Sequence, residues 1–246
     1  MKKIRLKNWV LWISLIGNVL LVTLVIFVGC IKTNYINSKL ERVGVMKIDP
    51  QKRGDFWSIR GWTNTLEKLH LDVDVVFFGN SITCGSSFEK YFPEVSICNL
   101  GYPGDNTDGM LMRVNQIKVV HPEKVFVMAG INGLHVQSEQ VFTEKYNLLV
   151  DSIIRAVPDA KIYLQSILPV NPSMMGKGSL FSKEKIRKCN EIVRNIAEKK
   201  GCVYVDLYKL YAVDGIMPTE LTRDGVHLFP ESYDRWADEI RKYIEE

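Results

Sequence analysis

The sequence has few of the residues that build metal centres and disulfide frameworks. Its 246 residues include only 5 cysteines and 4 histidines, and no two cysteines have the Cys-x-x-Cys spacing that is typical of zinc sites. Cys30 lies in a long apolar run, and we expect the other four to be free and mostly buried thiols, although a disulfide is permitted outside the cytoplasm. Internal repeats and low-complexity tracts are absent too, and the length allows one sizeable core, so a single globular domain is expected.

Most of the chain also lacks an excess of basic residues. The formal net charge is +4, but residues 1–53 hold ten Lys and Arg against two acidic residues. The remaining 22 basic and 26 acidic residues give the rest of the chain a net charge of −4. Nucleic-acid binding needs a basic face on the domain that contacts the phosphates. This charge distribution therefore argues against nucleic acid as the main partner.

The N-terminus, by contrast, carries a long apolar run at residues 9–31, preceded by a basic tail at residues 1–8. The run has 23 residues without charge, and a helix of that length can cross a hydrocarbon core roughly 30 Å thick. The basic tail predicts a cytoplasmic N-terminus, so we expect a single-pass membrane anchor with the rest of the chain outside the cytoplasm. A cleaved signal peptide is one alternative. Lipoprotein processing at Cys30 is another, because residues 27–30 loosely resemble a bacterial lipobox.

A linker and one folded domain are predicted to follow the anchor. Residues 32–54 are polar and basic, which is typical of a linker, and the domain is expected at residues 55–246. Residues 57–69 have apolar side chains at helical spacing, which predicts an amphipathic helix with its aromatic residues in the core.

Residues 73–206 alternate between short β-branched runs and helical patterns. The predicted strands are continuously apolar, as in strands buried on both faces of a sheet, and cover residues 73–79, 95–99, 124–129, 161–167 and 202–206. The predicted helices cover about residues 107–120, 139–156, 182–200 and 230–244. Strands that alternate with helices imply right-handed crossovers and a parallel sheet covered on both faces. We therefore expect a three-layer α/β/α domain.

Functional residues in such folds lie at the carboxyl ends of the strands, and a serine follows the first predicted strand. Residues 77–83 run from an apolar strand into a small-residue turn at Ser81, near a helix start whose amides favour negative charge. Ser81 is a candidate nucleophile, although a serine here can also simply cap the helix. In residues 222–230, His227 stands three residues after Asp224. With this spacing the histidine can accept a serine proton while the carboxylate orients its ring.

Two further segments can supply hydrogen-bond donors to a developing oxyanion. Residues 99–107 form a loop with glycines and a proline, whose backbone amides can point at a ligand oxygen. Asn132, after the third predicted strand, offers its side-chain amide at the same rim of the sheet. Both segments are also ordinary turn sequences, so each alone is a weak signal. His135 lies close to Asn132 in the sequence and is a further candidate to line the site.

Together and in this order, the four segments resemble the SGNH hydrolases, also called the GDSL esterase and lipase family, over about residues 73–244. The resemblance implies a flavodoxin-like sheet of five parallel strands, which agrees with the patterning. It also implies a catalytic triad of Ser81, Asp224 and His227. The implied oxyanion donors are the backbone amides of Ser81 and Gly104 and the side chain of Asn132.

The sequence departs from the family pattern at two places. Asn80 stands where the family's Gly-Asp-Ser has its aspartate, and Gly133 replaces the aspartate of the Asn-Asp pair. Neither position has a named chemical role, so the resemblance still implies a serine esterase that forms an acyl-enzyme on Ser81, without a metal or organic cofactor. The expected substrate is a short acyl ester, such as acetyl, on a carbohydrate or cell-envelope glycan. Lysophospholipase, thioesterase, acyltransferase and a non-catalytic binding module are the alternatives. Residues 169–178, with two methionines, can shape an acyl pocket or form a surface connection.

Overall fold

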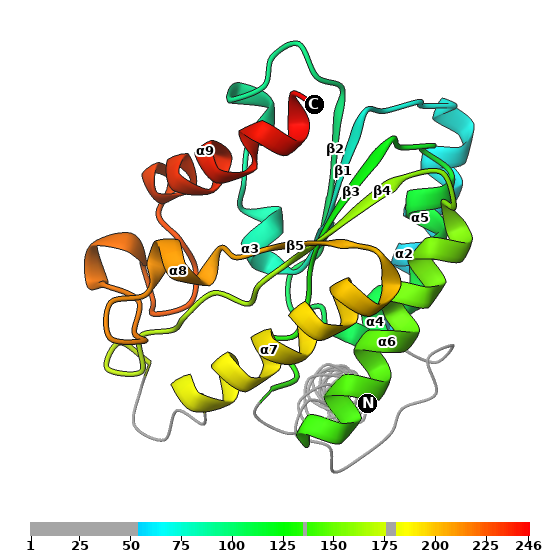
Figure 1. Ribbon diagram of the computed structural model, residues 1–246. Coiled ribbons are helices and arrows are strands. Elements are labelled where there is room, and N and C mark those ends of the chain that lie inside the picture. Colours follow the sequence, from blue (N-terminus) through cyan, green and yellow to red (C-terminus); the bar gives the residue numbers. More distant parts are fainter. Residues whose placement is uncertain (1–53, 135–136, 176–180) are drawn as a thin grey trace, which may run out of the picture. The chain divides into compact units, whose positions relative to one another are not determined.

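The computed structural model describes residues 54–134, 137–175 and 181–246 (Figure 1). All the described residues belong to one compact unit, Pro50–Glu246. The predicted basic tail, membrane anchor and nearly all of the linker therefore lie outside the described residues, as does His135. Within the described ranges, no helix combines the length and apolar character needed to cross a membrane.

The centre of the domain is a five-stranded parallel sheet with the strand order β2-β1-β3-β4-β5. Its strands are β1 Val75–Gly79, β2 Ile97–Gly101, β3 Lys124–Met128, β4 Lys161–Gln165 and β5 Val203–Val205. The three central strands are almost entirely buried, which explains their continuous apolar runs, whereas the edge strands β2 and β5 are only partly buried. The predicted parallel sheet of five strands is confirmed.

Helices cover both faces of this sheet (Figure 1). The longer ones are α2 Gly54–Leu69, α6 Glu139–Ala156, α7 Lys183–Lys200 and α9 Tyr233–Ile244, and the shorter ones are α3 Ser81–Cys84, α4 Thr107–Met112, α5 Asn115–Lys118 and α8 Tyr208–Tyr211. On one face α6 packs against α4, α5 and α7, and α2 contacts α5. On the opposite face lies α9, whose Tyr243 contacts the ring of Tyr163 in β4. The three-layer prediction is confirmed.

Local signals in the sequence fix the ends of the two long crossover helices. Ser138 caps α6 by accepting a hydrogen bond from the amide of Val141, and Ser182 caps α7 through the amide of Lys185. Gly201 ends α7 with a φ of 68°, a left-handed conformation that favours glycine. The boundaries predicted for both helices are therefore correct to within one residue.

Three predictions about local structure are wrong. The helix predicted over residues 107–120 is broken, because α4 ends at Met112 and α5 begins at Asn115. The backbone of Arg113 leaves the helix at φ −121° and ψ 16°. In α2, Trp62 is 61% exposed rather than part of the core, and Leu66 is the buried position. The four cysteines of the described domain are free thiols, but only Cys189 is buried.

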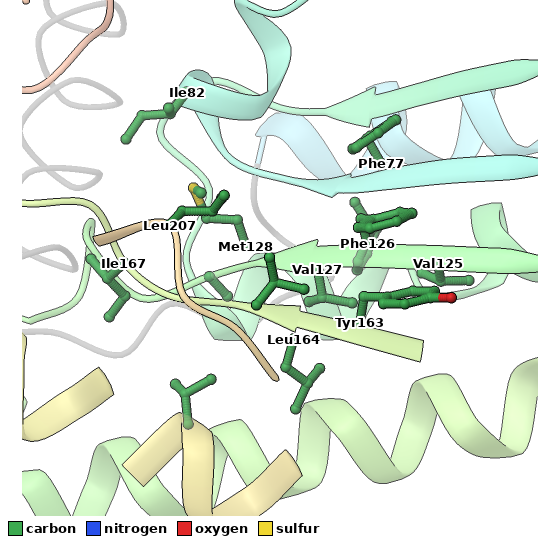
Figure 2. Close-up of a cluster of buried hydrophobic side chains, with 14 of the residues drawn as sticks. Phe77, Ile82, Val125, Phe126, Val127, Met128, Tyr163, Leu164, Ile167 and Leu207 are labelled. Atoms are coloured by element: carbon green, nitrogen blue, oxygen red, sulfur yellow. The ribbon is translucent and has the colours of Figure 1, made fainter. Parts of the chain in front are cut away.

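A row of aromatic rings runs across the sheet on the face that α9 covers. Phe77 of β1, Phe126 of β3 and Tyr163 of β4 stack with centroid distances of 5.1 and 4.4 Å (Figure 2). Phe88 stacks on Phe77 at 4.0 Å and meets the edge of Trp236 from α9 at 5.3 Å. Burial of each such ring contributes on the order of 2–3 kcal/mol. The row therefore helps to hold the adjacent central strands in register.

The register places three strand ends at one level of the sheet. Gly79, the last residue of β1, pairs with Gly101 at the end of β2 and with Met128 at the end of β3. Because all three strands are parallel, the segments that follow them leave from the same edge. The candidate residues predicted after the first three strands are therefore brought to one place.

Candidate active site

Ser81 is the first residue of α3, immediately beyond the end of β1. Asn80 caps this short helix, and its Oδ1 accepts a hydrogen bond from the amide of Ile82 at 2.9 Å. The amide oxygen thus does the capping that a carboxylate oxygen could do, while Asn80 Nδ2 has no partner within the part of the chain that the structure describes. Gly79 is also required, because a Cβ there would lie 2.1 Å from Thr83 Oγ1 and 2.9 Å from the carbonyl oxygen of Met128.

A chain of hydrogen bonds connects Ser81 to the segment before the last helix. The Ser81 hydroxyl lies 2.8 Å from Nε2 of His227, although the two residues are 146 positions apart in the sequence. His227 Nδ1 lies 2.6 Å from Oδ2 of Asp224. With the ring proton on Nδ1, the imidazole donates to the carboxylate and Nε2 accepts the hydroxyl proton of Ser81. The structure therefore brings Ser81, His227 and Asp224 together in the order that proton transfer from a serine requires.

The loop that carries His227 and Asp224 is held by its own hydrogen bonds. Asp224 Oδ1 accepts from the amides of Val226 and His227 at 3.0 and 2.8 Å. Thr222 Oγ1 donates to the carbonyl oxygen of His227 at 2.7 Å and accepts from the amide of Gly225 at 3.0 Å. Gly225 has a φ of 89°, a conformation that L side chains rarely adopt. This turn fixes the imidazole relative to the carboxylate before any substrate arrives.

The electrostatics of the loop keep the carboxylate charged. Partial burial tends to raise the pKa of Asp224, but the backbone amide and ring of His227 and the amide of Val226 outweigh it, so the pKa lies below its ordinary value. The side chains of His227 and Asp224 are 28% and 47% exposed. The pair is therefore ready to stabilise an imidazolium and is accessible from solvent.

The two predicted oxyanion segments touch each other. Gly104 has a φ of 76° and lies in a turn that the amide of Asp105 closes on the carbonyl oxygen of Tyr102 at 3.2 Å. The amide of Tyr102 in turn donates to the carbonyl oxygen of Gly79 at 2.9 Å, next to the serine turn. Asn132 Nδ2 donates to the carbonyl oxygen of Asp105 at 2.8 Å. This contact uses one of the two N–H groups on Nδ2, and the second can donate to a ligand oxygen.

Arg113 is an element of this region that the sequence prediction missed. Its guanidinium is 2% exposed and pairs with Asp105 at 2.6 Å, where burial lowers the pKa of the arginine and the Asp105 charge opposes that shift. A signal was present, because Arg113 is spaced three residues after Met110 and four before Ile117, both fully buried. A charged residue on the apolar face of a predicted helix requires buried polar partners.

The segment after β4 lies against the loop of the acid-base pair. The amide of Asn171 donates to the carbonyl oxygen of Gly225 at 2.8 Å, and a Cβ on Gly225 would lie 2.9 Å from Cγ of Met175 and 3.3 Å from Cβ of Met174. Met174 is 37% exposed. Two methionines therefore stand close to the acid-base loop, and their role in an acyl pocket stays a prediction. In the three described ranges, no group of three or more His, Cys, Asp or Glu residues is arranged to hold a metal ion.

Known proteins share both the sequence pattern and this architecture. The model of the GDSL-like Lipase/Acylhydrolase family matches residues 77–235, whereas no curated protein sequence matches significantly. A Streptococcus pneumonia structure, provisionally named as a platelet activating factor, has a TM-score of 0.67 at 22% identity over 75% of this chain and 92% of its own. A GDSL-like lipase from Bacteroides thetaiotaomicron has a TM-score of 0.64 at 22% identity over 77% and 98%. An acetyl xylan esterase has a TM-score of 0.59 at 19% identity over 70% and 99%.

At these identities the solved structures establish a shared fold, and the family model covers most of the domain, from β1 into α9. Its match begins four residues before Ser81 and ends eight residues after His227. The chain therefore belongs to the GDSL-like lipase/acylhydrolase family, the SGNH hydrolases, and is an enzyme of this ester-hydrolysing class.

Proposed function

We propose that this enzyme is a serine esterase that removes a short acyl group, acetyl in the first instance, from a carbohydrate or a cell-envelope glycan. The observation that carries the proposal is the continuous hydrogen-bonded chain from Ser81 Oγ to His227 Nε2 at 2.8 Å and from His227 Nδ1 to Asp224 at 2.6 Å. An isolated serine would be a poor nucleophile, but a neutral imidazole within hydrogen-bond reach can remove its proton during attack.

The proposed reaction has two halves. In the first, Ser81 Oγ forms a bond to the ester carbonyl carbon while His227 takes the hydroxyl proton, and Asp224 stabilises the imidazolium. The tetrahedral intermediate then expels the alcohol, to which His227 returns the proton, and an acyl-enzyme remains. In the second half, water gives a proton to His227 and attacks the acyl carbon. Collapse of this intermediate releases the carboxylic acid and restores the Ser81 hydroxyl.

The negative charge of each tetrahedral intermediate needs donors that are already in position. We assign this role to the backbone amides of Ser81 and Gly104 and to the side chain of Asn132. Loss of one such donor typically raises the barrier by about 3–4 kcal/mol. Asn132 donates a hydrogen bond to the carbonyl oxygen of Asp105, the residue after Gly104. This contact supports the assignment, because it holds two of the three proposed donor segments together.

Three observations support a small acyl group on a large, neutral alcohol. The acid-base pair is accessible, with a quarter to a half of each side chain exposed, so a polymer can approach it. A structural relative named as an acetyl xylan esterase shares the fold over 70% of this chain. The net charge of −4 downstream of residue 53 also favours a neutral glycan over a strongly anionic polymer.

A longer acyl chain, as in a lysophospholipase or thioesterase, is the second candidate. Met174 and Phe229 are large apolar side chains that are 37% and 36% exposed, and Phe229 follows His227 by two residues. Exposed apolar groups beside a catalytic loop can bind an acyl chain. The rate ratio between octanoyl and acetyl esters decides between the two candidates.

The experiment is hydrolysis of p-nitrophenyl acetate, butyrate and octanoate by the full chain in detergent, next to Ser81→Ala and His227→Ala. Activity that falls by at least 1,000-fold in both variants supports the serine mechanism, in line with the effect of removing triad members. Acetate release from an acetylated xylo-oligosaccharide then tests the glycan substrate, with lysophosphatidylcholine as the competing substrate. Unchanged activity in Ser81→Ala would overturn the mechanism.

We also propose that residues 9–31 anchor the enzyme, with the domain at residues 55–246 outside the cytoplasm. The support is the uncharged run of 23 residues behind a basic tail. The mass of the membrane-bound protein tests this, because processing at Cys30 would remove every residue before that cysteine. The intact mass supports the anchor, and a lipidated fragment that begins at Cys30 overturns it.

A further inference from the structure

Arg113 is a buried cation that the proposed triad does not use. Its side chain is 2% exposed and that of its partner Asp105 is 6% exposed, so both charges are removed from water. Such removal is unfavourable, and a buried ion pair is often no more stabilising than two apolar side chains of similar size. A contribution to the stability of the fold is therefore a poor explanation for this ion pair. The groups that Arg113 contacts are a better guide to its role.

The guanidinium binds three oxygen acceptors that belong to the segments of the site. Nε donates to Asp105 Oδ2 at 2.6 Å, Nη2 to the carbonyl oxygen of Gly79 at 2.8 Å, and Nη1 to that of Leu100 at 2.6 Å. Gly79 precedes Ser81 by two residues, and Leu100 precedes Gly104 by four. The group also lies over the ring of Phe78 at 4.2 Å, which fixes its plane. A planar fork of this kind can hold several acceptors in fixed directions, whereas an ammonium group cannot.

Asp105 extends the connection to the third proposed donor. Its carboxylate binds Arg113, its carbonyl oxygen accepts from Asn132 Nδ2 at 2.8 Å, and its own backbone follows Gly104 directly. A single guanidinium thus links the chain segments that present Ser81, Gly104 and Asn132.

We infer that Arg113, through Asp105, is a positioning residue that holds the three oxyanion donors in the geometry the transition state requires; this inference rests on the proposed function. Displacement of a catalytic group by about 1 Å can lower the rate on the order of 100-fold. The donors act mainly on the tetrahedral intermediate and much less on the bound ester. A substitution that removes hydrogen bonds of Arg113 should therefore lower kcat far more than it raises KM.

The test compares Arg113→Lys with wild type and with Arg194→Lys, all in the full chain. Arg194 is a matched control because it also pairs with an aspartate, Asp206 at 3.3 Å, and lies over a ring, Tyr204 at 4.7 Å, but it is 51% exposed and has no contact with the proposed site. Complete labelling with a fluorophosphonate counts the competent serines in each preparation. The kcat and KM for p-nitrophenyl acetate are then expressed per labelled site.

We expect the kcat of Arg113→Lys per labelled site to fall about 10- to 100-fold, with KM within about threefold of wild type and Arg194→Lys unchanged. A purely structural role would reduce the melting temperature and the labelled fraction but leave kcat per labelled site unchanged, and this result would overturn the inference alone. A folded wild type that neither hydrolyses an ester nor accepts the label would overturn the proposed function, and with it the role of Arg113.

Gly109→Ala decides the question where Arg113→Lys does not fold. A Cβ at Gly109 would lie 1.9 Å from Oδ1 of Asp105, so the alanine displaces the carboxylate without changing Arg113. Alanine is intrinsically the better helix former, so helix propensity alone would not predict a loss. We expect the same fall in kcat per labelled site with little change in KM. An unchanged kcat in this variant would overturn the inference.

Discussion

Asp224→Asn is the substitution that best separates catalysis from folding in this site. Asparagine has the same shape, and its Oδ1 can still accept the amides of Val226 and His227, now 3.0 and 2.8 Å from Asp224 Oδ1. Its other terminal group is an NH2 that faces His227 Nδ1, which lies 2.6 Å from the present Oδ2. Because this group donates, Nδ1 must accept, and the ring proton moves to Nε2. The imidazole then cannot take the proton of Ser81.

The size of the effect follows from the exposure of the carboxylate. The equivalent change in a buried serine-protease triad lowers kcat about 10⁴-fold. Asp224 is 47% exposed, so water screens its charge, and we expect about 10³-fold, or roughly 4 kcal/mol of barrier. The free energy of unfolding should change by less than about 0.5 kcal/mol, because the loop keeps its hydrogen bonds. Asp224→Ala also loses both backbone hydrogen bonds, at a cost of about 1–2 kcal/mol.

The assay is kcat for p-nitrophenyl acetate together with urea unfolding on the same preparations. Asp238→Asn is the matched control, because Asp238 is a mostly exposed carboxylate on α9 that lies 3.9 Å from Arg241 and outside the site. It should leave both kcat and the unfolding midpoint unchanged. Retention of more than a tenth of the wild-type kcat by Asp224→Asn would refute a tautomer-fixing role for Asp224.

Three further predictions concern the donors, acid stability and the core. Asn132→Ala should lower kcat about 100- to 1,000-fold with little change in KM in steady-state assays, because one oxyanion donor is lost; an equal rise in KM would argue for ground-state binding instead. The lowered pKa of Asp224 stabilises the fold above its unfolded pKa of about 3.9, and this contribution is lost as the pH falls through the lower folded pKa. The difference in urea midpoint between wild type and Asp224→Ala, which lacks the carboxylate and its hydrogen bonds, should therefore shrink as the pH falls from 5 to 2; a constant difference contradicts the assigned hydrogen bonds. Phe126→Ala should cost about 3–5 kcal/mol of unfolding free energy, because the ring is fully buried between Phe77 and Tyr163; a loss below about 1 kcal/mol would mean that the core refills the cavity.

The sheet was predictable because its central strands are buried on both faces. Such strands are continuous apolar runs with turn residues at their ends, and every predicted strand boundary is within two residues of the observed one. The long crossover helices were predictable for a second reason, since Ser138, Ser182 and Gly201 are local capping signals. In both cases the sequence signal that predicts the element lies within a few residues along the chain.

The wrong predictions depend on partners that are distant in sequence. The break after α4 turns Arg113 toward the carbonyl oxygens of Leu100 and Gly79, which are 13 and 34 residues away. The spacing of residues within 107–120 cannot predict a contact with carbonyl oxygens that lie outside this segment. The predicted burial of Trp62 is wrong for a related reason. The apolar spacing of a helix indicates which face is turned toward the core, but not how much of that face a neighbouring element covers.

Only part of the candidate active site could be predicted from residues close together in the sequence. The spacing of Asp224 and His227 indicates their contact, because three residues can close the turn that joins them. Nothing in either segment places Ser81 within 2.8 Å of a residue 146 positions away, and that pairing was expected only from four segments in family order. The structure brings Ser81, His227 and Asp224 together, and their chemical roles are part of the proposed function.

The strand order explains why consecutive segments converge on Ser81. β1 lies between β2 and β3, and the connection from β1 to β2 passes on the α9 face, since Phe88 stacks on Phe77 and contacts Trp236. The next connection, through α4 and α5, passes on the face of α6. β1 is followed by a connection on the α9 face and β3 by α6 on the other face, so the boundary between these two adjacent strands is the point in an open α/β sheet where ligands bind. Ser81 and Asn132 follow the two strands at this point, and Gly104 follows the neighbour β2. The three proposed donors come from three separate segments. Arg113, between α4 and α5, contacts carbonyl oxygens near the ends of both β1 and β2, so its guanidinium links two of these segments directly.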